Sequence, residues 1–520
     1  MQTQPPLHSP SHDKTAATPS TAHQISDNTL LLLIAAGVVL FHILTNGQYG
    51  FHRDELDILM NARQLEWGYV AYPPLTPFLA RLGLTLFGVS LVGLRLFSAL
   101  AQGIVIILAG LMVRDFGGRR FAQMTAAVAV AISPMALTAG TLIQYLSFDY
   151  LWWVLLAFCV TRLLRTENPR WWLGIGAAIG LGMMTKYTMA FFVVGLVTAV
   201  LITPSRRYLR SPWLWAGAGI AFLFFSPNLL WQLQHDFISL DFLQAIHARD
   251  IQWGRTDDFL VGQLHTAVNP ITLPLWVAGL LFFFIAPAGK RFRPLAWMFL
   301  TTFVLLWLSR GRAYYLGPAY PMLLAAGSAW AEGWIHTLSP RGARWARACL
   351  AAMLLVGGVV AVLIVKPVVP INSALWDVAS EISDTTSEMI GWTDLAQQVA
   401  EIYAALPPDQ QAVTRILAGN YGEAGALDLY GPEYGLPPVI SGANSLWAHG
   451  YGDPPPETVI VVGFEAGYAR RFFTNCESAG RVTNQYGVRN EESTRHTTLF
   501  VCREPKRPWA DMWAEMQWFQ

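Results

Sequence analysis

The stretch Phe51-His52-Arg53-Asp54-Glu55, followed about twenty residues later by Tyr72-Pro73-Pro74, lies between strongly hydrophobic segments. It places carboxylates, a histidine and an arginine where the chain has just left an apolar segment. Ionisable groups held against a bilayer are costly, so their presence there indicates a functional site. The stretch therefore predicts a charged loop at one face of a membrane, with apolar helices around it.

The composition supports the prediction of a membrane protein. Of 520 residues, 53% are hydrophobic and 13% are charged, whereas a soluble protein carries about 25% charged residues. Most of the chain is therefore expected to face lipid or protein. The formal net charge of +1 argues against a nucleic-acid-binding protein, which needs a basic surface. Membrane lipids, and no nucleic acid, are the expected partners.

Hydrophobic segments that approach the length of a bilayer-spanning helix, about 20 residues, recur along the first 370 residues. We predict a polytopic α-helical membrane domain, 28–370, with about eleven transmembrane helices. Their expected ranges are 28–45, 91–113, 122–140, 144–164, 171–185, 187–203, 212–232, 266–287, 293–309, 314–335 and 346–366. The short, proline-interrupted segment 73–88 is predicted to lie along the interface.

The basic residues indicate the orientation, because cytoplasmic loops are enriched in Lys and Arg. With the N-terminus in the cytoplasm, each of the five inner loops carries three basic residues. These are Arg114, Arg119 and Arg120; Arg162, Arg165 and Arg170; Arg206, Arg207 and Arg210; Lys290, Arg291 and Arg293; and Arg341, Arg344 and Arg347. The first loop, 46–90, the loop 233–263 and the C-terminal region then lie on the outer side of the membrane.

The two ends of the chain differ from this apolar middle. Residues 1–27 are polar and predict a disordered cytoplasmic tail, and no signal peptide is evident. Residues 371–505 predict a small soluble α/β domain, and 506–520 a C-terminal tail. Within the domain, helical spacing covers Thr393–Leu406. Strands are expected at Val413–Ala418, Thr458–Gly463, Arg481–Thr483 and Thr497–Cys502. Whether Cys476 pairs with Cys502 stays open.

Two interpretations of Asp54 and Glu55 compete. Carboxylates such as Glu55 and Asp57 favour the N-terminus of a helix that runs through Ile58-Leu59-Met60. Alternatively, a carboxylate beside His52 and Arg53 accepts a proton from an acceptor hydroxyl. Helix capping explains one of these acids and leaves the others available for chemistry.

The first span, then Arg53-Asp54-Glu55, then Gly68-Tyr69 through Leu75 (G-Y-x-x-Y-P-P-L), resembles the bacterial family 39 glycosyltransferases. These are relatives of protein O-mannosyltransferases and of the transferase that adds aminoarabinose to lipid A. Further matching positions are Thr185-Lys186-Tyr187, Gly262-Gln263, Asn269-Pro270, Tyr314-Tyr315 through Pro321, and Asn420-Tyr421-Gly422-Glu423-Ala424. The resemblance implies a GT-C fold, a polyprenyl-phosphate sugar donor and Asp54 as catalytic base.

The sequence also departs from the aminoarabinose branch. That branch has a basic residue after its Asp-Glu pair and a lysine before its Pro-Pro, where this chain has Asp57 and Tyr72. The resemblance therefore implies another branch, in which other cations meet the donor phosphate.

Lys186, Arg310 and Arg312 are the candidate phosphate-binding cations, because all three are expected at the outer face. Snorkelling of Lys186 and anchoring of the arginines in an aromatic belt are the alternatives. The expected substrate-binding residues are Arg53, Tyr72, Lys186, Arg310, Arg312, Tyr314, Tyr315 and Asp149, the last as a buried partner of a cation. Glu55 is expected to orient Asp54 or to bind sugar hydroxyls.

The loop 233–263 is expected to act as a lid. It is rich in His and Asp, but no spacing forms a metal motif, so the need for a divalent metal ion stays open.

The favoured function is an inverting glycosyltransferase that moves a sugar from a polyprenyl phosphate to a hydroxyl on a glycan, lipid or protein. A lipid-linked sugar flippase or transporter would carry its polar site at the midplane within repeated halves. A polysaccharide polymerase or ligase would transfer whole oligosaccharides instead.

Overall fold

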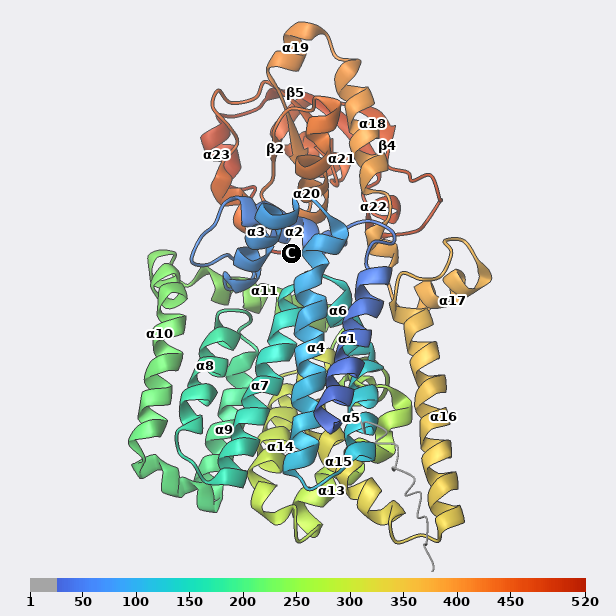
Figure 1. The fold of residues 1–520 in the computed structure, drawn as a ribbon. Coiled ribbons are helices and arrows are strands. Elements are labelled where there is room, and N and C mark those ends of the chain that lie inside the picture. Colours follow the sequence, from blue (N-terminus) through green and yellow to red (C-terminus); the bar gives the residue numbers. More distant parts are fainter. Residues whose placement is uncertain (1–25) are drawn as a thin grey trace, which may run out of the picture.

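The computed structural model describes residues 26–520, so the prediction for the tail at 1–27 falls, up to residue 25, outside the described residues. Long helices stand side by side in one layer, and a C-terminal domain built on a sheet covers one end of them (Figure 1). Between the two layers lies the first loop, with its short helices α2 (Arg53–Arg63) and α3 (Leu75–Phe87).

The helical layer overlaps every predicted span. Its helices are α1 (Asp27–Thr45), α4 (Leu91–Asp115), α5 (Arg120–Ala131), α6 (Pro134–Thr141), α7 (Tyr145–Thr166), α8 (Trp171–Met183), α9 (Met189–Ile202), α10 (Pro212–Gln234), α13 (Leu273–Ile285), α14 (Arg293–Leu308), α15 (Tyr320–Ile335) and α16 (Pro340–Val365). Within residues 26–520, 5 helices are long and apolar enough to cross a membrane singly, or up to 8 if each bent pair is one span. The chain is a polytopic helical membrane protein, and the number of crossings stays a prediction.

Two of the predicted spans are broken. Helices α5 and α6 meet at an angle of 66°, because Ser133 is extended before Pro134, as residues before proline prefer to be. The segment Phe259–Ala267 meets Pro270–Ile285 at 100°. It contains α12 (Phe259–Gly262), and Asn269 caps the turn that follows it. The predicted ranges 122–140 and 266–287 therefore each contain one of these breaks.

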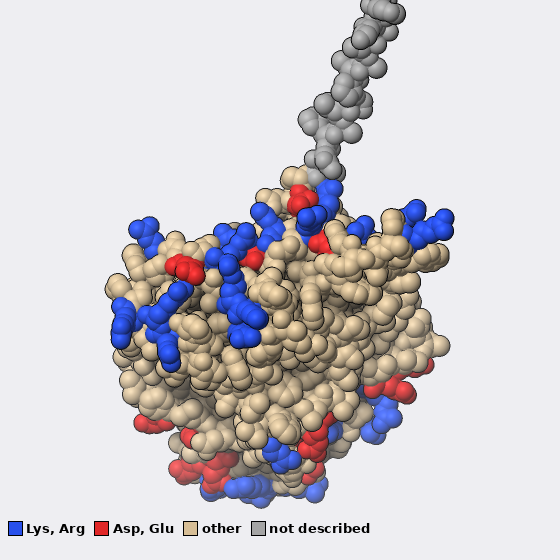
Figure 2. Space-filling model, turned by 90° about the horizontal axis from the view of Figure 1, so that it is seen from below, with Lys and Arg blue, Asp and Glu red and all other residues tan. Residues whose placement is uncertain are grey.

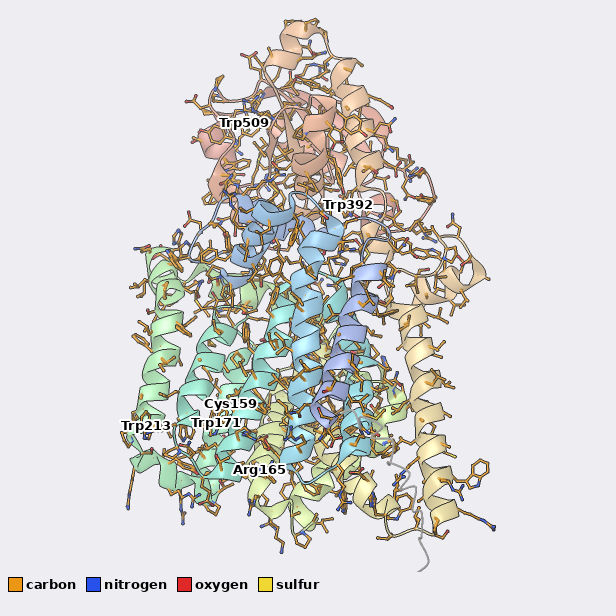
Figure 3. The ribbon with its side chains drawn as sticks, viewed as in Figure 1. Cys159, Arg165, Trp171, Trp213, Trp392 and Trp509 are labelled. Carbon is orange, nitrogen blue, oxygen red and sulfur yellow. A yellow bond between two sulfur atoms is a disulfide. The ribbon has the colours of Figure 1, made fainter. Side chains whose placement is uncertain are left out.

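Charged and aromatic side chains mark the opposite end of the helices. Figure 2 views this end, and Lys and Arg side chains gather along it. Arg165, Trp171 and Trp213 lie at this end, whereas Trp392 and Trp509 lie in the C-terminal domain (Figure 3). The Arg162 guanidinium lies 5.6 Å from the centre of the Trp171 ring. This is the arrangement expected for a membrane interface on the positive side.

The C-terminal domain is a five-stranded sheet in the order β2-β1-β3-β5-β4. Its strands are β1 (Thr414–Ala418), β2 (Val439–Ile440), β3 (Thr458–Val462), β4 (Phe473–Arg481) and β5 (Thr498–Pro505). Strand β1 is parallel to β2 and β3, and β5 is antiparallel to β3 and β4. The helices are α17 (Ala374–Ile382), α18 (Trp392–Ala404), α19 (Pro408–Ala412), α20 (Tyr421–Tyr430), α21 (Ala466–Phe472), α22 (Glu491–Thr494) and α23 (Trp509–Ala514).

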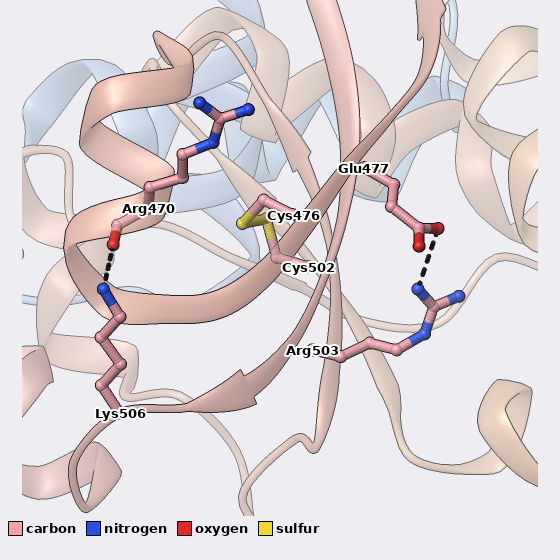
Figure 4. The surroundings of a disulfide bond; sticks show 6 residues. All are labelled: Arg470, Cys476, Glu477, Cys502, Arg503 and Lys506. Atoms are coloured by element: carbon pink, nitrogen blue, oxygen red, sulfur yellow. Dashed lines mark hydrogen bonds and ion pairs between the residues drawn. A yellow bond between two sulfur atoms is a disulfide. The ribbon is translucent and has the colours of Figure 1, made fainter.

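Residues 506–520 are not a tail. They include α23, and Trp509, Met512 and Met516 are buried against one face of the sheet. Burial of these large apolar side chains explains why the segment packs, since each removes much apolar area from water. Cys476 and Cys502 form a disulfide between the neighbouring strands β4 and β5 (Figure 4).

The expected loop 233–263 is also mostly ordered secondary structure, because α11 (Ile238–Gln252) occupies its centre. Figure 1 shows α11 between the helical layer and the first loop.

Helix α2 of the first loop has a capped N-terminus and packs tightly against the C-terminal domain. Helix α2 begins with a capping box in which the His52 amide donates to Glu55 Oε2 at 2.8 Å and the Asp54 amide donates to His52 Nδ1 at 3.2 Å. Helix α20 crosses α2 so closely that a Cβ at Gly425 would lie 2.7 Å from the Leu56 Cβ. The C-terminal domain therefore sits directly on the helix that carries Asp54.

A buried ion pair holds this loop to the helical layer. The side chains of Glu55 and Arg95 have no exposed surface. Arg95 donates from Nε and one terminal nitrogen to the two Glu55 oxygens at 2.9 and 2.6 Å, and its other bonds go to the carbonyls of Asn46 and Gly50. The Ile143 amide also donates to Glu55, at 2.8 Å. The loop, α4 and the turn before α7 are thereby joined.

We expect Arg95→Met to destabilise the folded protein by about 3–5 kcal/mol, because it leaves the Glu55 carboxylate buried without a counter-ion. Thermal unfolding of the purified protein in detergent measures this. Arg63→Met is the matched control: Arg63 pairs with Asp428 with both side chains more than one third exposed, and such pairs contribute about 0–1 kcal/mol. Equal unfolding temperatures for the two variants would contradict the role assigned to the buried pair.

Candidate functional site

Asp54 lies where two cavities meet. Cavity A has a volume of about 930 Å³ and cavity B of about 590 Å³. Asp54, Gln144, Tyr145, Tyr314 and Tyr421 line both of them. Since ligand sites usually measure about 300–1,000 Å³, each cavity has room for a ligand of its own. The Asp54 carboxylate stands on the boundary between them.

The Asp54 side chain is held but remains accessible. Tyr421 donates its hydroxyl hydrogen bond to Oδ1 at 2.9 Å, and the Gln144 amide donates to Oδ2. About a quarter of the side chain, 24%, is exposed. Two carboxylate oxygens offer about four lone-pair sites, so these two bonds leave acceptor capacity free. An accessible, oriented carboxylate of this kind can take a proton from a hydroxyl in either cavity.

Cavity A opens along the broken helices. Its walls come from Met135 in α6, from the break at Asn269-Pro270 and from the apolar face of α16. Val356 and Val360 of α16 are 58% and 50% exposed. The breaks therefore create the cavity, and α16 gives it an apolar side that faces the bilayer region.

Cavity B contains an ammonium group within an aromatic cage. The Lys186 nitrogen lies 4.9, 5.1 and 4.5 Å from the ring centres of Tyr145, Tyr314 and Tyr315. Among residues 26–520, no carboxylate lies within ion-pair distance of this nitrogen. The expected proximity of Lys186, Tyr314 and Tyr315 is thus observed. The Lys186 charge is available to an anion in cavity B.

The two predicted arginines also line cavity B, but both have partners. Arg312 donates two hydrogen bonds of 2.6 Å to Asp250 of α11, in the forked geometry typical of arginine. Arg310 pairs with Asp257 at 3.2 Å, with both side chains more than half exposed. The arginines therefore tie α11 and the segment after it to the turn before α15.

Arg53 turns toward the C-terminal domain. Its guanidinium bonds Glu491, lies 3.8 Å from Glu388 and 4.0 Å from Glu492, and stacks over the Tyr421 ring at 5.1 Å. Burial, and then the Glu492 carboxylate, raise the pKa of Glu388 to about 8. The Glu491 carboxylate thus pairs with the Arg53 charge, and because Arg53 also lines cavity A, its expected contact with a substrate stays a prediction.

Tyr72 lies at the edge of cavity B, beside Asp57. Its hydroxyl donates to Asp57 Oδ2 at 2.5 Å and accepts from Asn61 at 2.6 Å. Burial raises the pKa of Asp57 to about 7, although the hydrogen bonds from Tyr72 and Asn61 oppose this shift. The two positions where the aminoarabinose branch has cations are thus linked to each other.

The neighbouring carboxylates of Asp54 and Glu55 have different surroundings in the structure. Glu55 lines neither cavity and is enclosed by Arg95, so the expectation that it binds sugar hydroxyls is wrong. For Glu55, the alternative interpretation of the sequence, in which it caps the N-terminus of α2, is the one observed. Asp149 is buried as expected, and its oxygens accept from Trp153 at 3.0 Å and Thr188 at 3.1 Å. The Lys186 charge also acts on Asp149 electrostatically, without a direct ion pair.

The sequence reasoning missed Gln144 and Tyr145, and it noted Tyr421 only within a motif. Gln144 is a polar residue in an apolar stretch, which is a signal for a functional position. Tyr421 comes from a segment more than 360 residues away from Asp54, and no local pattern links the two. In the described part of the chain, no three His, Cys, Asp or Glu side chains gather as a metal site.

Comparisons with known proteins agree with this architecture. Residues 71–231 match the family model described as dolichyl-phosphate-mannose-protein mannosyltransferase. The chain is similar to the lipid A galacturonosyltransferase RgtD of Rhizobium johnstonii, with 27% identity over 224 residues, which is 41% of this chain and 46% of that protein. It is also similar to the undecaprenyl phosphate-alpha-4-amino-4-deoxy-L-arabinose arabinosyl transferase 1 of Pseudomonas fluorescens, at 28% over 246 residues, 43% of this chain and 41% of that protein. The matches span less than half of either relative.

The fold extends further than these sequence matches. The crystal structure of ArnT from Cupriavidus metallidurans bound to undecaprenyl phosphate is similar with a TM-score of 0.53 and 16% identity, covering 91% of this chain and 97% of that one. The apo structure of the same protein gives a TM-score of 0.55. The chain therefore has a GT-C fold, and its resemblance to the bacterial family 39 glycosyltransferases, first seen in the sequence, is confirmed.

Proposed function

We propose that the chain is an inverting glycosyltransferase of the bacterial inner membrane. It moves a sugar from a polyprenyl-phosphate donor to a hydroxyl group at the periplasmic face. The observation that carries this proposal is the Asp54 carboxylate at the junction of two cavities, one of which contains the Lys186 ammonium. A two-substrate transfer needs such an arrangement, because the base must reach the acceptor while a cation meets the leaving group.

Cavity B receives the donor. The Lys186 ammonium faces its interior within the tyrosine cage, where a phosphate would add the missing negative partner. Leu240 and Leu243 of α11, which are 53% and 38% exposed, give the cavity apolar surface for the first part of a polyprenyl chain. The similar ArnT protein was crystallised with undecaprenyl phosphate bound, which supports this donor class.

Cavity A receives the acceptor. Its apolar side along α16 suits a lipid-anchored molecule that enters from the bilayer. The similar galacturonosyltransferase RgtD is named for lipid A, which supports a lipid as acceptor. Helix α11 then takes the place of the predicted lid, held over cavity B by the Asp250–Arg312 pair.

The transfer needs one proton movement and one displacement. Asp54 takes the proton of the acceptor hydroxyl as its oxygen bonds to the anomeric carbon. The bond between that carbon and the phosphate oxygen breaks, and the phosphate leaves with the bonding electrons on the opposite face. Lys186 stabilises the charge that develops on the leaving oxygen. Gln144 and Tyr421 orient Asp54 during this step.

We expect Asp54→Asn to lower the transfer rate by about 10²–10⁴-fold, since an amide cannot accept the proton. Purified protein is incubated with a lipid-linked monosaccharide and an acceptor lipid, and released polyprenyl phosphate is measured. Glu66→Gln serves as the control, because Glu66 is an exposed carboxylate of the same loop. Wild-type turnover by Asp54→Asn, with an unchanged unfolding temperature, would refute the base assignment.

We expect Lys186→Met to lower kcat by about 10²–10³-fold, as loss of a donor to a developing oxyanion does. Lys186→Arg restores part of the rate, because it retains the charge inside the cage. The same assay, run at several donor concentrations, separates kcat from KM. A variant in which only KM rises would show that Lys186 binds the donor without stabilising the leaving group.

A further inference from the structure

Helix α17 lies at the end of α16 that carries the C-terminal domain (Figure 1). Leu375, Val378 and Ile382 are 51%, 54% and 61% exposed, and their spacing of three and four residues places them on one face of α17. Trp376 and Ala379 are buried on another face, which packs against the protein. An exposed apolar face of this kind marks a contact with a second apolar surface.

The connection from α16 holds α17 at the level where the first loop begins. Lys366, directly after α16, is buried and donates to Asn46 Oδ1 at 2.6 Å, at the end of α1. The Trp376 ring of α17 meets the Tyr49 ring edge-on, with centres 5.4 Å apart. Because Asn46 and Tyr49 are the residues with which the chain leaves α1, α17 lies at the boundary between the helical layer and the first loop.

Cavity A shows to which side the apolar face of α17 turns. Ile382 lines cavity A together with Val360 and Ile364 of α16. Helix α16 is one of the helices long and apolar enough to cross a membrane. The Ile382 side chain therefore faces the same space as the apolar side of α16, and Leu375 and Val378 share its face. The apolar face of α17 continues the exposed apolar surface of a membrane span.

The charges of this segment indicate which kind of lipid surface it fits. Residues 367–390 contain no Lys or Arg but four carboxylates, Asp377, Glu381, Asp384 and Glu388. Helices that are drawn to anionic lipids carry Lys and Arg on their polar face. Apolar burial is therefore the force available to hold α17 at a membrane, and neutral lipid is sufficient for it.

We propose that α17 lies in the membrane interface with Leu375, Val378 and Ile382 among the lipids, and that it forms the rim of a lateral entrance to cavity A. The segment 380–385, at the C-terminal end of α17, lines this cavity. A lipid that moves along α16 into cavity A thus passes Ile382. The membrane contact does not depend on the assigned activity, whereas the identity of the entering lipid as the acceptor rests on the proposed function.

Fluorescence quenching in nanodiscs of neutral phosphatidylcholine measures the contact. In the full chain with Cys349→Ser, which removes the exposed free thiol, one new cysteine carries a small fluorophore. Lipids with a nitroxide near the head group should quench Leu375→Cys and Ile382→Cys at least about twice as strongly as Asp377→Cys, because interfacial helices bury only their apolar face, about 5–10 Å deep. The second control, Asp409→Cys, lies in α19 at the far end of the C-terminal domain (Figure 1) and should stay unquenched.

Two outcomes of this experiment would overturn the proposal. One is equal quenching at all four labelled positions, and the other is quenching of α17 that appears only after anionic lipid is added. Unfolding temperatures in detergent identify any labelled variant that is misfolded, and the two positions on the apolar face test the contact independently.

The transfer assay tests the rim. Ile382→Asp should raise the KM for a lipid-anchored acceptor about tenfold, because a carboxylate in an opening that faces lipid is costly, and should leave the donor KM unchanged. Asp377→Asn, outside cavity A, should change neither. An unchanged acceptor KM in a stable Ile382→Asp would refute the rim. Absence of transfer in the unchanged protein would refute the proposed function and the acceptor's use of this entrance together, whereas the quenching decides separately whether α17 contacts lipid.

Discussion

The buried pair between Glu55 and Arg95 is the constraint on which the site depends. Arg95 is fully buried near the start of α4, and the first loop supplies the acceptors for its donors, which are the Asn46 and Gly50 carbonyls and the Glu55 carboxylate. Glu55 in turn caps α2 and accepts from the Ile143 amide. Three segments far apart in the sequence are thereby fixed together. Asp54 precedes Glu55 directly, so its position follows from this pair.

Breaks in the helices provide the space around Asp54. A continuous α5–α6 helix and a continuous helix through 259–285 would fill the region of cavity A. Instead, prolines at 134 and 270 follow extended residues, and the chain turns by 66° and 100° at these two points. Irregular backbone at membrane depth is tolerated where it lines a cavity. The broken spans are therefore consistent with a site that both water and lipid can reach.

The distribution of charge partners decides which cations remain available. Arg53, Arg310 and Arg312 each pair with carboxylates. Arg53 joins the first loop to the C-terminal domain, whereas Arg310 and Arg312 join the turn before α15 to α11 and the segment after it. Lys186 contacts aromatic rings instead. An enclosed charge without an ion-pair partner is costly. An anion bound beside Lys186 would therefore be stabilised more than one bound beside the paired arginines.

Sequence by itself determined the local features. Hydropathy located the helices, the arginine-rich loops marked one end, and the motifs from Arg53-Asp54-Glu55 to Tyr314-Tyr315 identified the fold and brought Asp54, Lys186 and the tyrosines into one hypothesis. Short apolar runs of strand length also located β1 and β3. These features depend on neighbours in the chain, so a pattern reveals them.

Only the tertiary structure decided which charged residue does what. Asp54 and Glu55 are adjacent and chemically alike, yet Arg95, 40 residues beyond Glu55, encloses one and leaves the other at the cavities. Asp250, 62 residues before Arg312, likewise determines that this arginine is paired. The role of an ionisable group depends on the charges and the solvent around it. Those neighbours are brought together by folding over distances that no local sequence pattern records.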